Sequence, residues 1–357
     1  MCLLGVMISM YHAFYLADPT PDQALRLIAQ NRISLTTVIP LAYQSRMQQV
    51  PGVREVMIYN WYGGTYKDNR DPKNQFARFA VEPEKLFKIF GEFRIAADQK
   101  AAFEHDRAGC VIGRDLANTF GFKLGDRIHL TGDIYPGELE LTVRGIFDSP
   151  AASNLLFFDK EYLDQSQPER RRGNVSMFEI LIDNPANSAR IAQSIDEMFH
   201  NSPAQTKTES EQAFFVGFLS LLGNVKMFLM AIAAAVMFTV LLVSANTMAM
   251  SVRERVREVG VLKTLGFTPG AVLGLILGEA CVISVCGGAV GFAISALLMR
   301  GVEKSPFGGF LPALPLIEPG VAVTCLIAAG MIGVISSLVP ALGASRTPIV
   351  QALRSTD

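Results

Sequence analysis

The stretch SVRERVREVGVLKTLGFTPG, residues 251–270, decides how the C-terminal half of this chain is organised. Its basic residues Arg253, Arg255, Arg257 and Lys263 lie within eleven positions, and long apolar runs lie on both sides of it. Membrane proteins concentrate Lys and Arg in short cytoplasmic loops. If the flanking runs cross a bilayer, this loop faces the cytoplasm and sets the orientation of every other segment.

The same loop has a helical pattern of its own. One helical face carries the valines Val252, Val256 and Val259. Gly260 weakens this helix, Gly266 resembles a C-terminal cap, and Thr268 followed by Pro269 is typical of the start of a new helix. The sequence therefore predicts two short helical pieces between two long helices. A solvated loop that only sets the topology is the alternative, and the residues leave it open.

Composition limits the class of protein. Half of the 357 residues are hydrophobic, 18% are charged, and the net charge is −1. The apolar excess lies in residues 212–357, whereas residues 18–211 resemble an ordinary soluble domain. A near-neutral balance gives no support to nucleic-acid binding. The five cysteines show no spacing typical of a metal site.

Four apolar runs predict four transmembrane helices. Residues 1–17 form the first, which we interpret as most of a helix whose cytoplasmic start is missing; a longer upstream reading frame with Lys or Arg would support this. The other three are residues 217–249, 271–299 and 320–344, each long enough to cross about 30 Å of hydrocarbon. With 251–270 inside, both chain ends are cytoplasmic, and the domain at 18–211 and the loop at 301–319 are outside.

Residues 18–211 read as a mixed α/β domain. Strands are predicted at 53–61, 75–81 and 175–182, and helices at 83–90 and 187–199. A β-branched run also occupies 32–39. Within the segment VIGRDLANTFGFKLGDRIHL, a helix over 114–120 is ended by Gly121, and Asp159 is the N-cap of a later helix. A strand–helix–strand unit thus occurs at each end of the domain, with an insert at 82–172 between them.

The basic cluster at 170–172 has two interpretations. It is either a patch that binds a partner or, more often for such a run, a solvated loop.

Small residues recur at helical spacing in the third apolar run. The repeats are Gly270, Gly274 and Gly278, followed by Gly287 and Gly291. Such glycines let helices approach closely in lipid, which predicts a dimer interface or a tight contact within the chain. The alternative is that Gly is simply common in transmembrane helices.

Glu279 is the only charge of the third run. An intramembrane carboxylate is a functional-site hypothesis by default. Because the fourth run offers no ionisable partner, we favour a structural or gating role over proton coupling.

No enzyme motif is present in the sequence. There is no GxxxxGK[ST] phosphate loop, no GxSxG elbow and no HExxH pair. Nothing assembles a nucleophile, a base and an oxyanion site, so we predict no catalytic residue, no cofactor and no metal.

The pattern RERVREVGVLKTLGFTPGAVLGLILGEA, at 253–280, resembles the FtsX-like permease domain of ABC transporters, the MacB/LolC/LolE superfamily. Two further segments resemble the periplasmic core domain of the same family. The first is VIGRDLANTFGFKLGDRIHL followed by LELTVRGIFD, and the second is HNSPAQTKTESEQAF at 200–214. The order of helix, large external domain and three helices is also similar.

The resemblance implies a fold and a set of partners. The fold would be an α-helical membrane protein of four transmembrane helices with an inserted extracytoplasmic α/β domain. That domain is similar to a Porter-like part at 30–81 and 173–210 with a Sabre-like insert at 82–172, followed by an FtsX-like permease domain at 212–357. A separate ABC ATP-binding subunit would bind ATP, and a second permease copy, as homodimer or heterodimer, would complete the transporter. A periplasmic adaptor is a further partner that the resemblance allows.

In this family the cytoplasmic loop docks on the ATPase. Carried onto this sequence, the coupling residues are Glu258, Val259, Gly260, Val261, Leu262, Lys263, Leu265 and Gly266. The implied function is ATP-powered export, or lipoprotein or envelope handling, by mechanotransmission in the bacterial inner membrane. Two alternatives stay open: a regulator that switches a periplasmic cell-wall hydrolase, and a membrane-anchored receptor with no ATPase. The chain lacks the fused ATPase of MacB, so that subunit would be another chain.

Overall fold

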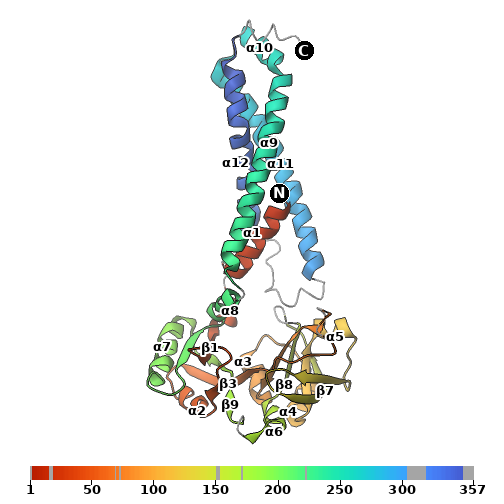
Figure 1. Ribbon diagram of the computed structural model, residues 1–357, viewed down its shortest axis with the longest axis vertical. Coiled ribbons are helices and arrows are strands. Elements are labelled where there is room, and N and C mark those ends of the chain that lie inside the picture. The colour runs from red at the N-terminus through yellow and green to blue at the C-terminus, as the bar shows by residue number, and fades with distance from the viewer. Residues whose placement is uncertain are drawn as a thin grey trace. The chain divides into compact units, whose positions relative to one another are not determined.

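Nine of the described strands form a single mixed sheet in the computed structural model of this chain (Figure 1). The structure describes residues 2–15, 19–68, 70–71, 74–149, 153–169, 172–221, 223–303 and 319–348. These divide into two units, one made mainly of residues 18–222 and the other of the helices at 1–17 and from residue 223 onward. The sheet belongs to the first unit, and its strand order is β11-β1-β10-β3-β4-β8-β5-β7-β6.

One half of the sheet is antiparallel and joins strands from both ends of the domain. Its strands are β11 (Thr206–Ser210), β1 (Arg26–Asn31), β10 (Met177–Ile182) and β3 (Val53–Trp61). In the register of β1 and β10, Ile28 lies opposite Glu179. The helices α2 (Tyr43–Met47) and α7 (Ser188–Met198) pack on one face of this half through Met47, Ile191 and Ile195. Short elements complete it: η1 (Gln23–Leu25), η4 (Pro185–Asn187), and the paired strands β2 (Ile39–Pro40) and β9 (Asn174–Val175).

The other half of the sheet contains parallel pairs. Its strands are β4 (Ala77–Val81), β8 (Leu155–Asp159), β5 (Gly109–Gly113), β7 (Gly137–Phe147) and β6 (Arg127–Gly132). β4 runs parallel to β8, and β5 runs parallel to β7. One face is covered by α5 (Arg114–Phe120) and α6 (Lys160–Ser166), with Leu116 and Leu163 in the core.

A third core extends under both halves on one side of the sheet. It includes α3 (Pro83–Ile89) and α4 (Ala97–His105), with Leu86 and Phe103 fully buried. The helix α8 (Glu211–Leu221) adds Phe214 to this core. The half-buried Trp61 also packs against it, with its ring edge-on to Phe79 and tilted against Phe218 of α8.

Local signals in the sequence agree with most of these elements. β3 occupies the predicted 53–61, and Gly121, with a φ of 72°, ends α5 in the left-handed conformation. The Asp159 side chain accepts a hydrogen bond from the backbone N–H of Glu161 and caps α6. The β-branched run at 32–39 differs: only its last residue is a strand, and the buried strand is β1, immediately before it.

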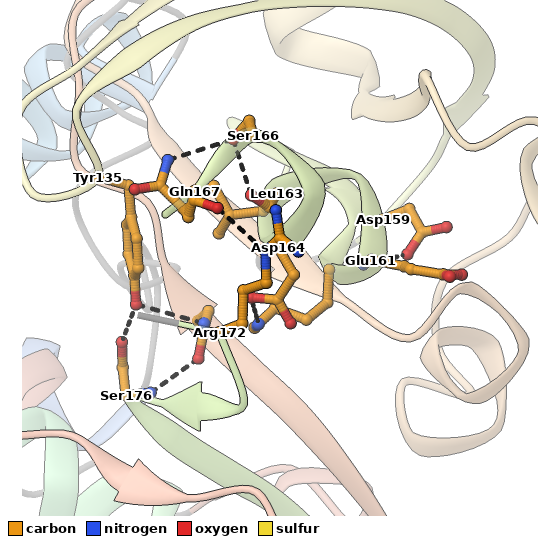
Figure 2. A network of polar contacts seen from close by, with 11 residues as sticks. Tyr135, Asp159, Glu161, Leu163, Asp164, Ser166, Gln167, Arg172 and Ser176 are labelled. Atoms are coloured by element: carbon orange, nitrogen blue, oxygen red, sulfur yellow. Dashed lines mark hydrogen bonds and ion pairs between the residues drawn. The ribbon is translucent and has the colours of Figure 1, made fainter. Parts of the chain in front are cut away.

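A buried polar network joins the two halves of the sheet. Asn60 of β3 is fully buried, and its Oδ1 accepts a hydrogen bond from the backbone N–H of Ser176 at 2.7 Å. Its Nδ2 donates to the hydroxyl of Tyr135, from the β6–β7 hairpin, which also contacts the Ser176 hydroxyl (Figure 2). The same figure shows Arg172 Nε donating to the carbonyl of Gln167 after α6. Of the predicted basic cluster, residues 170 and 171 lie outside the described residues.

The second unit is helical. It contains α1 (Cys2–Tyr15), α9 (Val225–Glu254), α10 (Val256–Thr264), α11 (Pro269–Glu303) and α12 (Pro319–Arg346). Among the described residues, three helices are long and apolar enough to cross a membrane, at Lys226–Glu254, Pro269–Leu298 and Gly320–Arg346. α1 is apolar but shorter, so the first of the four predicted spans stays a prediction. Most of the predicted loop at 301–319 lies outside the described residues.

Candidate functional site

The predicted coupling loop folds into α10, which lies between α9 and α11 in the chain. Gly260 does not interrupt this helix; Val259 and Gly260 are the buried residues that attach it to the bundle. Gly266, with a φ of 96°, ends the turn after α10, and α11 starts at Pro269 as predicted. Thr268 Oγ1 accepts a hydrogen bond from the backbone N–H of Ala271.

α10 exposes an apolar strip on its other side. Val261 is 46% exposed and Leu265 is 71% exposed, and Phe267 follows at 45%. The spacing of Val261 and Leu265 by four residues places both on one helical face. Such a strip, flanked by the exposed charges of Arg257 and Glu258, is suited to an apolar contact with a polar rim.

The remaining predicted coupling residues have different surroundings. Leu262 and Lys263 are half-buried, and Gly266 is exposed. Lys263 Nζ donates a hydrogen bond to the carbonyl of Thr347 at 2.7 Å, so it fastens α10 to the end of α12. The structure thus separates the predicted set into residues that hold α10 in place and residues that it presents to solvent.

Glu279 has a partner that is distant in sequence. Nη1 of Arg255, at the junction of α9 and α10, lies 2.7 Å from Glu279 Oε1 on α11. The pair gives the charge in the third apolar run a counter-ion on the basic loop, and the structural or gating role of Glu279 stays a prediction.

The predicted packing glycines mostly face open space within the described chain. A Cβ built at Gly270, Gly274, Gly278 or Gly287 meets nothing within 4 Å, whereas Gly291 is buried. Their packing against a second copy stays a prediction.

The close contacts between the membrane helices use other small residues. A Cβ at Gly288 would lie 2.6 Å from Ala329 Cβ, and one at Gly333 would lie 2.8 Å from the carbonyl oxygen of Ala280. On α1, a Cβ at Gly5 would lie 2.9 Å from Ser295 Oγ. These positions let α11 approach α12 and α1 closely.

Sequence reasoning missed one set of charged residues in the α/β unit. Arg26, the first residue of β1, is 2% exposed and has three carboxylates around it, from Glu92, Glu179 and Glu211. The sequence pattern did not reveal this strand, because three of the six residues of β1 are polar: Arg26, Gln30 and Asn31. Without the strand, the burial of Arg26 could not be predicted.

No metal centre is visible among the described residues, where no three His, Cys, Asp or Glu side chains are grouped as ligands. The described residues thus form a helical bundle, which carries the exposed apolar strip of α10, and a sheet domain.

Family comparisons agree with this arrangement. The "MacB-like periplasmic core domain" family matches residues 3–198, more than half of the chain, and the "FtsX-like permease C-terminal" family matches residues 230–349.

Curated relatives carry related names. An uncharacterized ABC transporter permease of Methanocaldococcus jannaschii is 26% identical over 86% of this chain and 77% of its own length. The ABC transporter permease YtrF of Bacillus subtilis is 24% identical, over 63% of this chain and 54% of its own length. The macrolide export ATP-binding/permease protein MacB of Shewanella oneidensis is 35% identical over 30% of this chain, which is 16% of that protein.

Among solved structures, the periplasmic region of MacB from Actinobacillus actinomycetemcomitans is similar with a TM-score of 0.40 and 9% identity, over 56% of this chain and 93% of that one. The two family matches together with the named relatives carry the assignment: the chain belongs to the FtsX-like permeases of ABC transporters that contain a MacB-like periplasmic core domain.

Proposed function

We propose that this chain is the transmembrane subunit of an ABC transporter that works by mechanotransmission. A separate ATP-binding subunit docks on α10 and binds the ATP, and the resulting movement of the membrane helices is passed to the core domain at 18–211. The observation that carries the proposal is the exposed apolar strip of Val261, Leu265 and Phe267 on a short helix between two long apolar helices. An apolar strip on a solvent-exposed loop is typical of a surface that binds another protein.

The topology of the proposal follows from charge. The basic residues near α10 support a cytoplasmic position for this helix, and we propose that α1 belongs to the first of four spans. The core domain then lies in the periplasm of a bacterial inner membrane, with a Porter-like part at 30–81 and 173–210 and a Sabre-like part at 82–172. We propose that two permease copies and two ATP-binding subunits form the working unit.

Export is the preferred form of the activity. Its support is that relatives of this chain in Shewanella are macrolide export ATP-binding/permease proteins. We therefore place export of a substrate across the cell envelope ahead of lipoprotein handling or regulation of a periplasmic hydrolase.

Co-purification tests the docking surface. The chain is co-expressed with an ABC ATP-binding subunit, and Leu265→Asp is compared with Leu124→Asp, a matched change at an exposed leucine of the α/β unit. A charge on the apolar strip is expected to remove the ATP-binding subunit and its ATP hydrolysis, while Leu124→Asp retains both. Leu265 is preferable to Leu262 because Leu262 is half-buried, and a carboxylate there would disturb α10 itself. Equal retention by wild type and Leu265→Asp would place the contact elsewhere and overturn the docking surface.

A further inference from the structure

A buried guanidinium connects α8 to the nine-stranded sheet. Arg26 Nε donates a hydrogen bond to Glu211 Oε2 at 2.8 Å, and Glu211 is the first residue of α8. Arg26 Nη1 lies 2.8 Å from Glu92 Oε1, in the loop after α3. The guanidinium also stacks on the Phe90 ring, 4.6 Å from its centroid. One side chain of β1 thus contacts both the loop after α3 and the first residue of α8, which directly follows β11, the strand paired with β1.

Glu179 is the third carboxylate of this cluster and lacks a good partner. It is 1% exposed, and its Oε1 lies 4.0 Å from Arg26 Nε with no hydrogen bond to any described residue. With all four groups ionised, three negative charges face one positive charge in a buried site. An uncompensated buried charge of this kind is strongly unfavourable.

The surroundings favour the neutral form of Glu179. Burial raises the pKa of Glu179 well above its usual range, the negative charges of Glu211 and Glu92 add to this, and Arg26 opposes it. Burial also raises the pKa of Glu211, although the direct ion pair with Arg26 works against the shift. Tyr59 of β3 faces the same cluster, and burial raises its pKa well above 10, so its hydroxyl stays neutral near neutral pH.

We propose that Arg26, Glu92, Glu179 and Glu211 form a protonation-controlled latch that fastens α8 to the sheet. When Glu179 is neutral, Arg26 is shared by Glu92 and Glu211 and α8 is docked. When Glu179 ionises, a second excess negative charge enters the site, and release of Glu211 to water relieves it. α8 ends at Leu221 and the second membrane helix begins at Val225, so the latch lies on the segment through which the proposed mechanotransmission would pass. Its role in transmission rests on the proposed function, but the latch itself does not.

The direction of the pH dependence follows from linkage. Because docking raises the pKa of Glu179, the docked state binds its proton more tightly, and docking is strongest at low pH and weakens as pH rises through the raised pKa. The pKa of Glu179 is higher in the docked state than in the released state. For each pKa unit of this difference, the ratio of docked to released α8 changes about tenfold across the titration.

The chain contains a native probe of this equilibrium. Trp61 is the only tryptophan of the sequence. Its ring centroid lies 6.4 Å from that of Phe218 on α8 and 5.2 Å from that of Phe79 on the sheet. Release of α8 therefore uncovers Trp61, which increases its quenching by acrylamide and shifts its emission to longer wavelength.

The experiment is a pH titration of Trp61 quenching between about pH 5 and 9, with the whole chain in lipid nanodiscs and without ATP or any partner subunit. The acrylamide quenching constant of the wild type is expected to rise toward alkaline pH. Glu179→Gln, which mimics the protonated acid, is expected to keep the low-pH value throughout. Glu55→Gln, at a half-buried glutamate of β3, is the matched control and should titrate like the wild type. Phe218→Ala, which removes the contact, gives the value for an uncovered Trp61.

Two results would overturn the latch: a wild-type quenching constant that does not change with pH, or a Glu179→Gln chain that retains the full change. If far-ultraviolet circular dichroism shows that Glu179→Gln does not fold, Glu92→Gln replaces it, because this change leaves the Arg26–Glu211 pair in place. Removing the charge of Glu92 lowers the pKa of Glu179, so the midpoint of the titration must move to lower pH, and an unmoved midpoint contradicts the proposal. Since no ATP-binding subunit is present, failure here leaves the docking surface on α10 untouched, and failure of co-purification leaves the latch untouched.

Discussion

Arg255 and Glu279 form an ion pair, with Nη1 and Oε1 2.7 Å apart, that connects the start of α10 to α11. Glu279 is ten residues into α11, or about 15 Å along its axis. The long Arg255 side chain thus reaches back along the bundle and gives the carboxylate a counter-ion.

Charge reversal tests this pair. Arg255→Glu places two carboxylates together and is expected to lower the thermal midpoint of the chain in detergent, whereas Arg255→Glu combined with Glu279→Arg restores it. An exposed pair contributes about 0.2–1 kcal/mol, and lipid around it would increase the effect. Arg253→Glu, at an exposed neighbour, is the control. A double variant no more stable than the single one would show that the two side chains do not interact.

Substitution by valine should have different effects on the stability of the chain at two adjacent glycines of α11. Gly288→Val is expected to destabilise the helical bundle by about 1–3 kcal/mol, because its Cβ would lie 2.6 Å from Ala329 Cβ. Gly287→Val should leave the isolated chain unaffected, since nothing lies within 4 Å. Thermal unfolding in detergent measures both. If Gly287→Val instead reduces a dimer to a monomer in size-exclusion chromatography, the predicted glycine interface with a second copy gains direct support.

The hydrogen bonds of Asn60 are expected to stabilise the contact between the two halves of the sheet. Asn60→Leu leaves the backbone N–H of Ser176 without its 2.7 Å acceptor in a buried site, which costs about 1–3 kcal/mol. Asn201→Leu, at an exposed position, should change little. Denaturant unfolding followed by Trp61 fluorescence compares them, and equal midpoints for the two variants would refute the importance of the network.

The ion pair of Arg114 and Asp148 predicts a small acid sensitivity. Hydrogen bonds from Arg114, at 2.9 and 3.0 Å, hold the pKa of Asp148 below its usual value. A lowered pKa contributes stability that is present above the ordinary Asp pKa of about 3.9 and is lost as pH falls through the lowered value.

Both side chains of this pair are about half exposed, so solvent screening limits the contribution to less than about 1 kcal/mol. Asp148→Asn should therefore lower the thermal midpoint slightly at pH 7, and the difference should shrink as pH falls through the lowered pKa of Asp148. A difference that persists unchanged at pH 2 would assign the effect to packing and not to charge.

Local signals explain why much of the fold could be predicted. A cap such as Asp159 or a left-handed residue such as Gly121 acts on the backbone within a few residues, so its effect is visible in the sequence. The long apolar runs are equally local, and they predicted α9, α11 and α12. β1 could not be found in this way, because the burial of Arg26 depends on carboxylates 66 and 185 residues further along the chain.

The sequence by itself determined that the chain has a basic loop between long apolar helices and an α/β domain before them, because hydropathy and helix signals are properties of neighbouring residues. It also predicted the start of α11 at Pro269, but not that α10 runs uninterrupted through Gly260. Only the tertiary structure decided that α10 is held by Val259 and presents Leu265, and that Glu279 is paired with Arg255. Burial and ion pairing are set by which segments pack together, and that depends on the whole chain.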